Sequence, residues 1–237
     1  MRNELHIFKK GFSFAVDGPG NRLVYHLRGC NFRCAWCANP ECFLPNDGPG
    51  LPVEDVLKEA ERARPLYIAG GGVTFTGGEP TCQFSALRDA LTGLRERGIH
   101  TCLESNAAHP RLPELFPLAD MLILDCKHYD DALHRQWTGQ GNGLVLENIR
   151  QAARAHGNLL VRIPLIGGVN ASGEDAAAFA RLFAAMGEFP VELLRYHEFG
   201  KPKWEGQGLE YRMHDAEVTL EQAERFEQIL LQLKACA

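Results

Sequence analysis

The chain has 237 residues, of which 45% are hydrophobic and 23% charged, and its formal net charge is -5. This composition is typical of a globular protein and gives no support to nucleic-acid binding. No stretch approaches the ~20 apolar residues that a membrane span needs, and residues 1–10 lack the apolar core of a signal peptide. We therefore expect a cytoplasmic protein that contacts no nucleic acid and no membrane. The 8 cysteines are too few for a disulfide scaffold.

Strand-like and helix-like segments alternate along the chain. An N-terminal hairpin is expected from residues 5–8 and 12–16. Further strands are expected at 23–28, 72–76, 100–104, 121–124, 159–163 and 191–196. Helices are expected from Pro52 onward, over 84–94 and 142–156, after Ser172, which can cap a helix, and over 219–233. Residues 45–50 are expected to form a loop, and no linker or repeat divides the chain.

The order of these segments predicts the fold class. Apolar runs such as residues 122–124 are typical of strands covered on both faces. Alternation of such strands with helices favours a parallel sheet with right-handed crossovers. About six units are too few for an eight-stranded barrel. We expect an α/β fold, a partial (β/α)6 barrel of parallel strands with helices outside and an N-terminal hairpin extension.

Three cysteines, Cys30, Cys34 and Cys37, follow the first parallel strand with the spacing CxxxCxxC. Thiolates select soft metals such as zinc or iron–sulfur clusters. No fourth cysteine completes the set, and a site that keeps one position open can bind another ligand there. The alternative is a closed zinc or cluster site with a remote fourth ligand such as Cys42 or His26.

Polar or charged residues also follow the other predicted strands. Because the carboxyl ends of parallel strands share one edge of the sheet, we expect these groups to lie close together. A polar ligand with both amino and carboxylate groups would satisfy them. The set comprises Gly77, Gly78, Glu79, Glu104, Asp125, Lys127, Arg162 and His197. Taken singly, each has an ordinary structural explanation, such as a turn for the glycines and a solvated ion pair for Asp125 and Lys127.

The cysteine spacing, with Trp36 before the last cysteine, resembles the signature of the radical S-adenosylmethionine (SAM) superfamily, and residues 77–79 resemble its second motif. Residues 16–22, the Asp125-x-Lys127 pair and residues 196–204 narrow the resemblance to the activating enzymes of glycyl-radical enzymes. The pyruvate formate-lyase activase type is the most similar. The resemblance implies one radical SAM domain over 1–237, with its core at about 17–204 and a C-terminal helix at 219–233.

The resemblance also implies the cofactors and their contacts. Cys30, Cys34 and Cys37 would hold one 4Fe–4S cluster, whose open iron would bind the amino and carboxylate groups of SAM. Gly78 and Glu79 would meet the methionine amino group. The remaining SAM contacts would come from Trp36, Cys37, Ala38, Asn39, Gly77, Glu104, Asp125, Lys127, Arg162 and His197. The reduced cluster would cleave SAM to a 5′-deoxyadenosyl radical, so no catalytic acid or base is expected.

The implied substrate is another protein. The radical would abstract a hydrogen from a glycine of a glycyl-radical enzyme, whose glycine-bearing loop would be held by Asp17, Gly18, Pro19 and Gly20. The composition of this run also predicts a hairpin turn, and such a turn can still be a contact surface. An electron donor such as flavodoxin or ferredoxin would reduce the cluster, and oxygen sensitivity implies anaerobic function. Two alternatives stay open, a radical SAM enzyme acting on a small molecule and a non-catalytic metal-binding or redox module.

Two features depart from the family patterns. The activase pattern has Asp followed by Thr-Asn-Gly where this chain has Glu104 followed by Ser105, Asn106 and Ala107. The carboxylate at this position therefore reaches one methylene further, which puts its cation or cofactor contact in doubt. Some activases also insert a ferredoxin-like domain after the cysteine loop. Residues 38–53 are too short for one, and we expect a single cluster.

Overall fold

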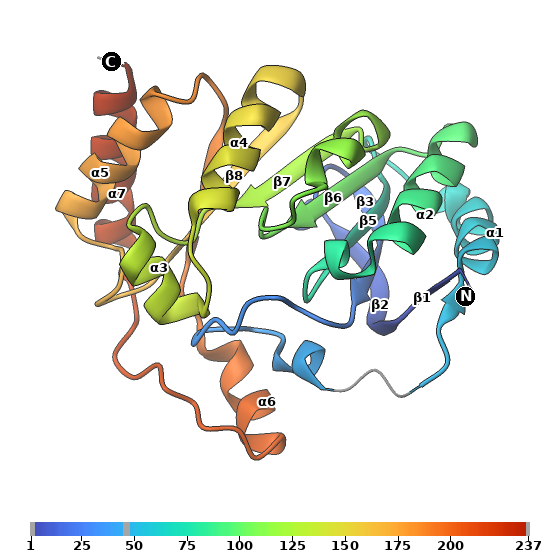
Figure 1. The fold of residues 1–237 in the computed structure, drawn as a ribbon, viewed down its shortest axis with the longest axis horizontal. Helices are drawn as coiled ribbons and strands as arrows, with labels where there is room; N and C mark the ends of the chain where they lie inside the picture. The colour runs from blue at the N-terminus through green and yellow to red at the C-terminus, as the bar shows by residue number, and fades with distance from the viewer. Residues whose placement is uncertain (1–2, 45–47, 236–237) are drawn as a thin grey trace. The chain divides into compact units, whose positions relative to one another are not determined.

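The computed structural model describes residues 3–44 and 48–235. Seven strands form one sheet in the order β2-β3-β5-β6-β7-β8-β9, and β1 pairs with β4 in a separate two-stranded sheet (Figure 1). The pairs β3–β5, β5–β6 and β8–β9 are parallel, and β2–β3 is antiparallel. The predicted α/β class, with a mainly parallel sheet and an antiparallel N-terminal hairpin, is confirmed. The loop expected at 45–50 lies partly outside the described residues, and Cys236 lies wholly outside them.

The described chain divides into two compact units, and each is treated by itself. Unit 1 comprises Met1–Asn31 and Asn39–Ile123, and unit 2 comprises Phe32–Ala38 and Leu124–Ala237. The single domain expected over 1–237 therefore stays a prediction. No helix among residues 3–44 and 48–235 is long and apolar enough to cross a membrane.

Unit 1 contains the hairpin, three parallel strands and two long helices. Its strands are β1 (Glu4–Leu5), β2 (Ile7–Phe14), β3 (Asn21–Leu27), β4 (Leu51–Pro52), β5 (Gly72–Gly77), β6 (Thr101–Ser105) and the first part of β7 (Met121–Asp125). Its helices are η1 (Pro40–Phe43), α1 (Val53–Ala63), η2 (Arg64–Leu66), η3 (Pro80–Gln83), α2 (Phe84–Glu96) and η4 (Leu112–Leu118). The buried sides of α1 and α2 carry Val56, Leu57, Leu87 and Leu91.

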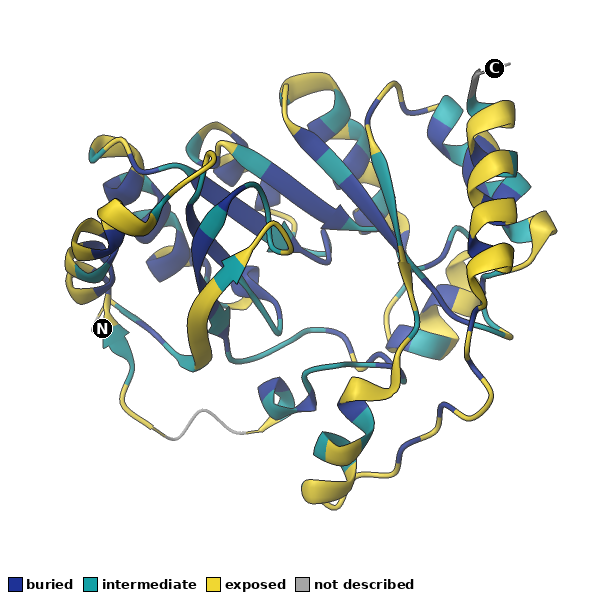
Figure 2. Cartoon of the chain, turned by 180° about the vertical axis from the view of Figure 1, so that it is seen from behind, coloured by how far each residue is buried: buried dark blue, intermediate teal, exposed yellow. Residues whose placement is uncertain are grey.

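The antiparallel hairpin is present, but its strands differ from those expected at 5–8 and 12–16, because β2 runs unbroken through Gly11 and pairs with β3. The hairpin turn that the composition of Asp17–Gly20 favours is confirmed. The turn lies at residues 15–20, where Gly18 and Gly20 have φ values of 111° and 67°. Left-handed backbone of this kind suits glycine. Gly11 is tolerated because β2 is an edge strand, which Figure 2 shows as largely exposed.

Unit 2 contains the last two strands and most of the remaining helices. Its elements are α3 (Asp131–Thr138), α4 (Gly143–Ala155), β8 (Leu159–Leu165), α5 (Gly173–Ala184), β9 (Val191–Arg195), η5 (Glu198–Gly200), α6 (Lys201–Gly206) and α7 (Leu220–Ala235). Ser172 caps α5 in a capping box with Asp175, as its sequence position predicts. Phe179 of α5 packs against Phe226 of α7 with ring centroids 6.1 Å apart. This contact places α7 in the core of unit 2.

Two short helices escaped the sequence prediction. The first, α3, begins at an Asp130 side chain that accepts a hydrogen bond from the Leu133 amide, and ends at Gly139 in the left-handed conformation. The second, α6, has a proline in its first turn. Both carry local start or stop signals, but neither is long enough to show a clear apolar period.

Candidate radical SAM site

The Gly77–Glu79 segment lies directly against the chain that leads to Cys30. The amide of Gly78 donates to the carbonyl of Leu27 at 2.9 Å, and the amide of Glu79 donates to that of Gly29 at 2.8 Å. A Cβ on Gly78 would lie 2.1 Å from the Gly29 oxygen. The position therefore requires glycine for close backbone approach, rather than only for a turn.

The Glu79 side chain lies inside unit 1, with no exposed surface. Its Oε1 accepts from the amide and hydroxyl of Thr81 at 3.0 and 2.5 Å and from the Ser105 hydroxyl at 2.9 Å. Its Oε2 accepts from the Asn106 amide at 2.7 Å. Burial raises the pKa of this carboxyl, while these hydrogen bonds oppose the rise. Glu79 thus joins the end of β5 to the end of β6, and its contact with the SAM amino group stays a prediction.

Asn106 links the Glu79 network to the first cysteine. Its side-chain nitrogen donates to the Asn31 side chain at 2.7 Å and lies 3.9 Å from the Cys30 sulfur. Ala107 follows with a φ of 59°, the left-handed conformation that glycine would adopt more easily. The departure from Thr-Asn-Gly therefore leaves this turn in place, because the Ser105 hydroxyl also accepts from the Ala107 amide at 3.0 Å.

Glu104 uses its additional methylene within the sheet. Its Oε2 accepts a 2.7 Å hydrogen bond from the Thr76 hydroxyl on the neighbouring strand β5. The carboxylate is thereby tied to the end of β5. Whether it also contacts a cofactor is part of the function proposed below.

In unit 2, the start of the cysteine loop is held by the end of α3. The amide of Arg33 donates to the Thr138 carbonyl at 2.7 Å, and the amide of Ala35 donates to the Trp137 carbonyl at 3.1 Å. These are the last carbonyls of a helix, which have no partner within it. The backbone on both sides of Cys34 is therefore fixed by a helix terminus.

A buried histidine lies one turn earlier on α3. His134 packs edge-on against Phe32, with ring centroids 5.3 Å apart. Its Nδ1 lies 2.6 Å from the Gln140 carbonyl oxygen, so Nδ1 carries the proton and donates it. Its Nε2 is buried without a hydrogen-bond partner. Burial lowers the pKa of His134, and the ring is neutral.

The η5–α6 segment holds the other end of the cysteine loop. Nε1 of Trp204 donates to the Cys37 carbonyl at 2.8 Å, and the Lys203 ammonium donates to the Ala38 carbonyl at 2.9 Å. Gly200 lies so close that an added Cβ would stand 2.5 Å from the Cys37 oxygen. Residues 200–204, to which the sequence analysis assigned no individual roles, thus contact the third cysteine directly.

The four charged or polar candidates of unit 2 are all partnered. The Lys127 ammonium lies 2.9 Å from the Asp125 carboxylate, and the two side chains are 13% and 31% exposed. Arg162 is buried and pairs with Glu192 on the neighbouring strand β9. The solvated ion pair considered for Asp125 and Lys127 is wrong in one respect, because Lys127 is mostly buried.

His197 follows β9 and is exposed. Its Nδ1 accepts a 3.4 Å hydrogen bond from the Phe199 amide, and the two rings lie 4.4 Å apart. It lines a hollow of about 600 Å³, whose full lining is residues 195–198 and 217–219. This hollow is large enough for a small organic ligand.

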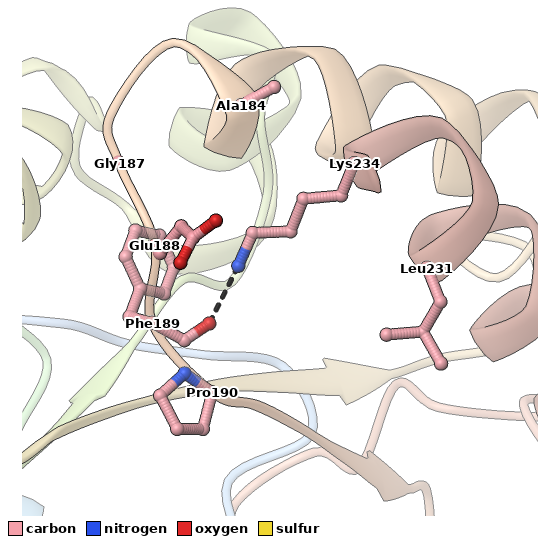
Figure 3. Close-up of a pocket in the computed structure, with 7 residues that line it drawn as sticks. All are labelled: Ala184, Gly187, Glu188, Phe189, Pro190, Leu231 and Lys234. Atoms are coloured by element: carbon pink, nitrogen blue, oxygen red, sulfur yellow. Dashed lines mark hydrogen bonds between the residues drawn. The ribbon is translucent and has the colours of Figure 1, made fainter. Parts of the chain in front are cut away.

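Another pocket of unit 2, of about 560 Å³, contains none of the predicted site residues (Figure 3). The Lys234 ammonium points across it and donates to the Phe189 carbonyl at 2.6 Å. Burial lowers the pKa of Lys234. We assign this pocket to packing between α7 and the segment before β9.

The donor chemistry fits an iron–sulfur cluster. Cys30, Cys34 and Cys37 follow β3 on one loop, and an amide donor near the Cys30 sulfur is a contact that tunes such clusters. No group of three or more His, Cys, Asp or Glu side chains that could hold a metal ion is found among the described residues. The fit therefore rests on the three thiols and the backbone contacts that hold their loop.

A family comparison identifies the chain. Residues 24–180 match the model of the radical SAM superfamily. The chain belongs to this superfamily. It is 34% identical over 204 residues to a pyruvate formate-lyase 1-activating enzyme of Escherichia coli (strain K12), covering 84% of this chain and 83% of that protein. It is a radical SAM enzyme homologous to pyruvate formate-lyase activating enzymes.

Two solved structures share the fold of this chain. A domain of a pyruvate formate-lyase-activating enzyme from Bacteroides vulgatus superposes with a TM-score of 0.57 at 30% identity, over 69% of this chain and 95% of that one. SuiB of Streptococcus suis, bound to its precursor peptide SuiA, superposes with a TM-score of 0.69 at 16% identity, over 90% of this chain and 45% of SuiB. The second likeness concerns the fold alone.

Proposed function

We propose that this radical SAM enzyme activates a glycyl-radical enzyme by removing a hydrogen atom from one of its glycines. The observation that carries the proposal is the contact between residues 200–204 and the third cysteine. This run narrowed the sequence resemblance to the activases, and in the structure it holds the Cys37 and Ala38 carbonyls. The identity to the E. coli activating enzyme, which extends over 84% of the chain, supports the same reading.

In this proposal Cys30, Cys34 and Cys37 bind one 4Fe–4S cluster. When bound and reduced, the cluster would supply one electron for breaking the C5′–S bond of SAM, which would give methionine and the 5′-deoxyadenosyl radical that removes the glycine hydrogen. The protein binds and orients the reactants and excludes water. An electron donor of the flavodoxin or ferredoxin class and a cytoplasmic, anaerobic setting belong to the same proposal.

The SAM contacts are assigned from the sequence prediction and the burial of each residue. Gly77 and Gly78 offer backbone at a point where no side chain fits. The backbone of residues 36–39 flanks the third cysteine, and the exposed His197 and mostly buried Lys127 offer polar atoms. Asp125, Arg162 and Glu104 complete the set, and Glu79 acts chiefly by fixing the β5 and β6 ends.

The decisive experiment uses the anaerobically reconstituted full chain, dithionite and SAM, with E. coli pyruvate formate-lyase as the probe. We expect 5′-deoxyadenosine together with a glycine-radical EPR doublet on the probe. 5′-Deoxyadenosine without a doublet on this or any other glycyl-radical enzyme would favour a small-molecule substrate. Absence of 5′-deoxyadenosine would contradict both enzyme functions and favour a metal-binding or redox module.

A ligand test accompanies it. Cys34→Ala should abolish iron loading while leaving the far-ultraviolet circular dichroism unchanged. The matched control is Cys82→Ala, because Cys82 is exposed and lies outside the three-cysteine loop. Full iron content in the Cys34 variant would overturn the ligand assignment.

A further inference from the structure

The Asp17–Gly20 turn folds over one face of the sheet in unit 1. Arg22 of β3, Thr74 of β5 and Cys102 of β6 lie on this face, which we call the Arg22 face, because paired residues of parallel strands point the same way. The Thr74 hydroxyl donates to the Asp17 carbonyl at 2.7 Å. A Cβ on Gly18 would lie 3.3 Å from the Cys102 sulfur. The turn therefore packs directly on the start of this face.

The same face continues toward the predicted SAM site. Thr76 and Glu104 lie two residues beyond Thr74 and Cys102 on β5 and β6, and they bond to each other. Two residues of a strand span about 7 Å. The turn thus packs two strand residues away from Glu104. In the sequence the turn precedes β3, whereas the cysteine loop follows β3. Groups held by the turn and by the strand ends can contact one substrate segment that lies along this face.

The Arg22 guanidinium holds the turn in place. It has no exposed surface, and six hydrogen bonds connect it to three separate segments. Within the turn it donates to the Pro19 carbonyl at 3.1 Å. From β5 it contacts the Thr74 hydroxyl and the Val73 carbonyl, both at 2.7 Å. From the loops before β5 and β6 it contacts the carbonyls of Gly70 and His100, both at 3.4 Å, and the His100 Nδ1 at 3.3 Å.

This arrangement needs an arginine. The guanidinium is a planar fork with five donors, whereas a lysine ammonium has three on a single atom. A buried cation is tolerated only where its donors are satisfied, and the carbonyl oxygens around Arg22 do this. Thr74 connects the two parts, since its hydroxyl accepts from Arg22 and donates to Asp17. The turn, the guanidinium and the hydroxyl form one chain of hydrogen bonds.

We propose that Arg22 is a positioning residue that fixes the Asp17–Gly20 turn in the conformation that receives the partner's glycine-bearing segment. The inference rests on the function proposed above. In the proposed function the partner segment is a stretch of backbone that carries a glycine, and a turn that receives it has to present its own groups at a fixed place. Arg22 acts through the turn and touches no reacting atom.

The test uses two variants. Thr74→Val keeps the shape of the side chain and breaks the hydrogen-bond link between Arg22 and Asp17. Arg22→Lys keeps the charge and loses the planar guanidinium. Thr101→Val is the control, because Thr101 is also buried in this sheet but bonds to Leu118 and Asp120. Amide hydrogen exchange is followed at Ala15 and Asn21, whose amides donate to Gly20 and Ile68. A second readout is the ratio of glycine radical on E. coli pyruvate formate-lyase to 5′-deoxyadenosine formed.

Both test variants should exchange these two amides about tenfold faster than wild type, and the radical ratio should fall about tenfold, while Thr101→Val changes neither. Unchanged exchange at Ala15 and Asn21 in both variants would overturn the positioning role. Faster exchange with an unchanged ratio would overturn its link to the partner. If wild type gives no glycine radical, the proposed function fails with this probe, and the exchange result still decides the role of Arg22 in the turn.

Discussion

A methyl group added at Gly200 tests how the third cysteine is held. Gly200 has ordinary helical dihedral angles (φ -76°, ψ -29°), so alanine introduces no backbone strain there. Its Cβ would lie 2.5 Å from the Cys37 oxygen, whereas ordinary contact begins at 3.4 Å, so the two segments must separate by 0.9 Å. That movement lengthens the 2.8 Å Trp204 bond and the 2.9 Å Lys203 bond beyond hydrogen-bond range.

The loss of these two hydrogen bonds can be expressed as a change in the rate at which the cysteine loop opens. A neutral hydrogen bond contributes ~0.5–1.5 kcal/mol, and the partly exposed lysine bond adds ~1 kcal/mol at most. Opening of the loop should therefore become easier by ~0.5–2.5 kcal/mol, which corresponds to about 2- to 60-fold. The assay is the anaerobic rate of iron release from reconstituted protein to an excess of chelator.

The control is Gly206→Ala in the same helix, where an added Cβ meets no atom within 4 Å. It should release iron at the wild-type rate. If Gly200→Ala also released iron at that rate, the η5–α6 segment would not hold the cysteine loop, and the reasoning from these contacts would be refuted. Trp204→Phe should give an intermediate rate, since it removes one hydrogen bond and keeps the ring.

Three further predictions follow from buried groups. Glu79→Gln places an amide against the Asn106 amide donor and should destabilise unit 1 by ~2–4 kcal/mol in urea unfolding; a loss below ~0.5 kcal/mol would contradict the four-bond network. Because the pKa of His134 is lowered in the folded chain, this side chain takes up a proton near pH 6.5 when the chain is unfolded but only at lower pH when it is folded. The free energy of unfolding therefore falls with falling pH, by up to ~1.4 kcal/mol per pH unit. His134→Asn should remove this contribution to the change of stability between pH 7 and 5, as measured by thermal unfolding. The same pH dependence in the variant and in wild type would exclude a neutral buried ring. Gly78→Ala should prevent correct folding of the strand end, because its Cβ would meet the Gly29 oxygen, and wild-type 5′-deoxyadenosine formation by this variant would show that the approach is not required.

The sequence predicted the order of the strands and helices, because long apolar segments and their spacing are local properties. It misplaced the bounds of the hairpin strands, since only pairing with β3 shows that residues 9–11 lie within β2. It missed α3 and α6, which are shorter than the window over which a helical period becomes visible. The first error concerns a feature that depends on contacts between distant residues, and the second concerns the length of the element.

The candidate site was predicted with the same limits. The sequence identified Cys30, Cys34 and Cys37 and the groups after each strand, because their types and spacing are visible in one dimension. It could not show that the Glu79 carboxylate is buried, since two of its four donors come from the distant end of β6. Nor could it show that Arg22 holds the neighbouring turn, because its partners come from the loops before β5 and β6.

The contacts to Cys37 and Ala38 have a consequence for the order of events during protein synthesis. The donors on Trp204 and Lys203 lie 167 and 165 residues later in the chain than the carbonyls they hold. The cysteine loop leaves the ribosome long before α6 exists, and at ~5–20 residues per second it waits roughly 8–30 s for its final partners. In the proposed function, stable insertion of the cluster would therefore be a late step in biogenesis, and the thiols would need protection from oxygen and stray metals until α6 has been made.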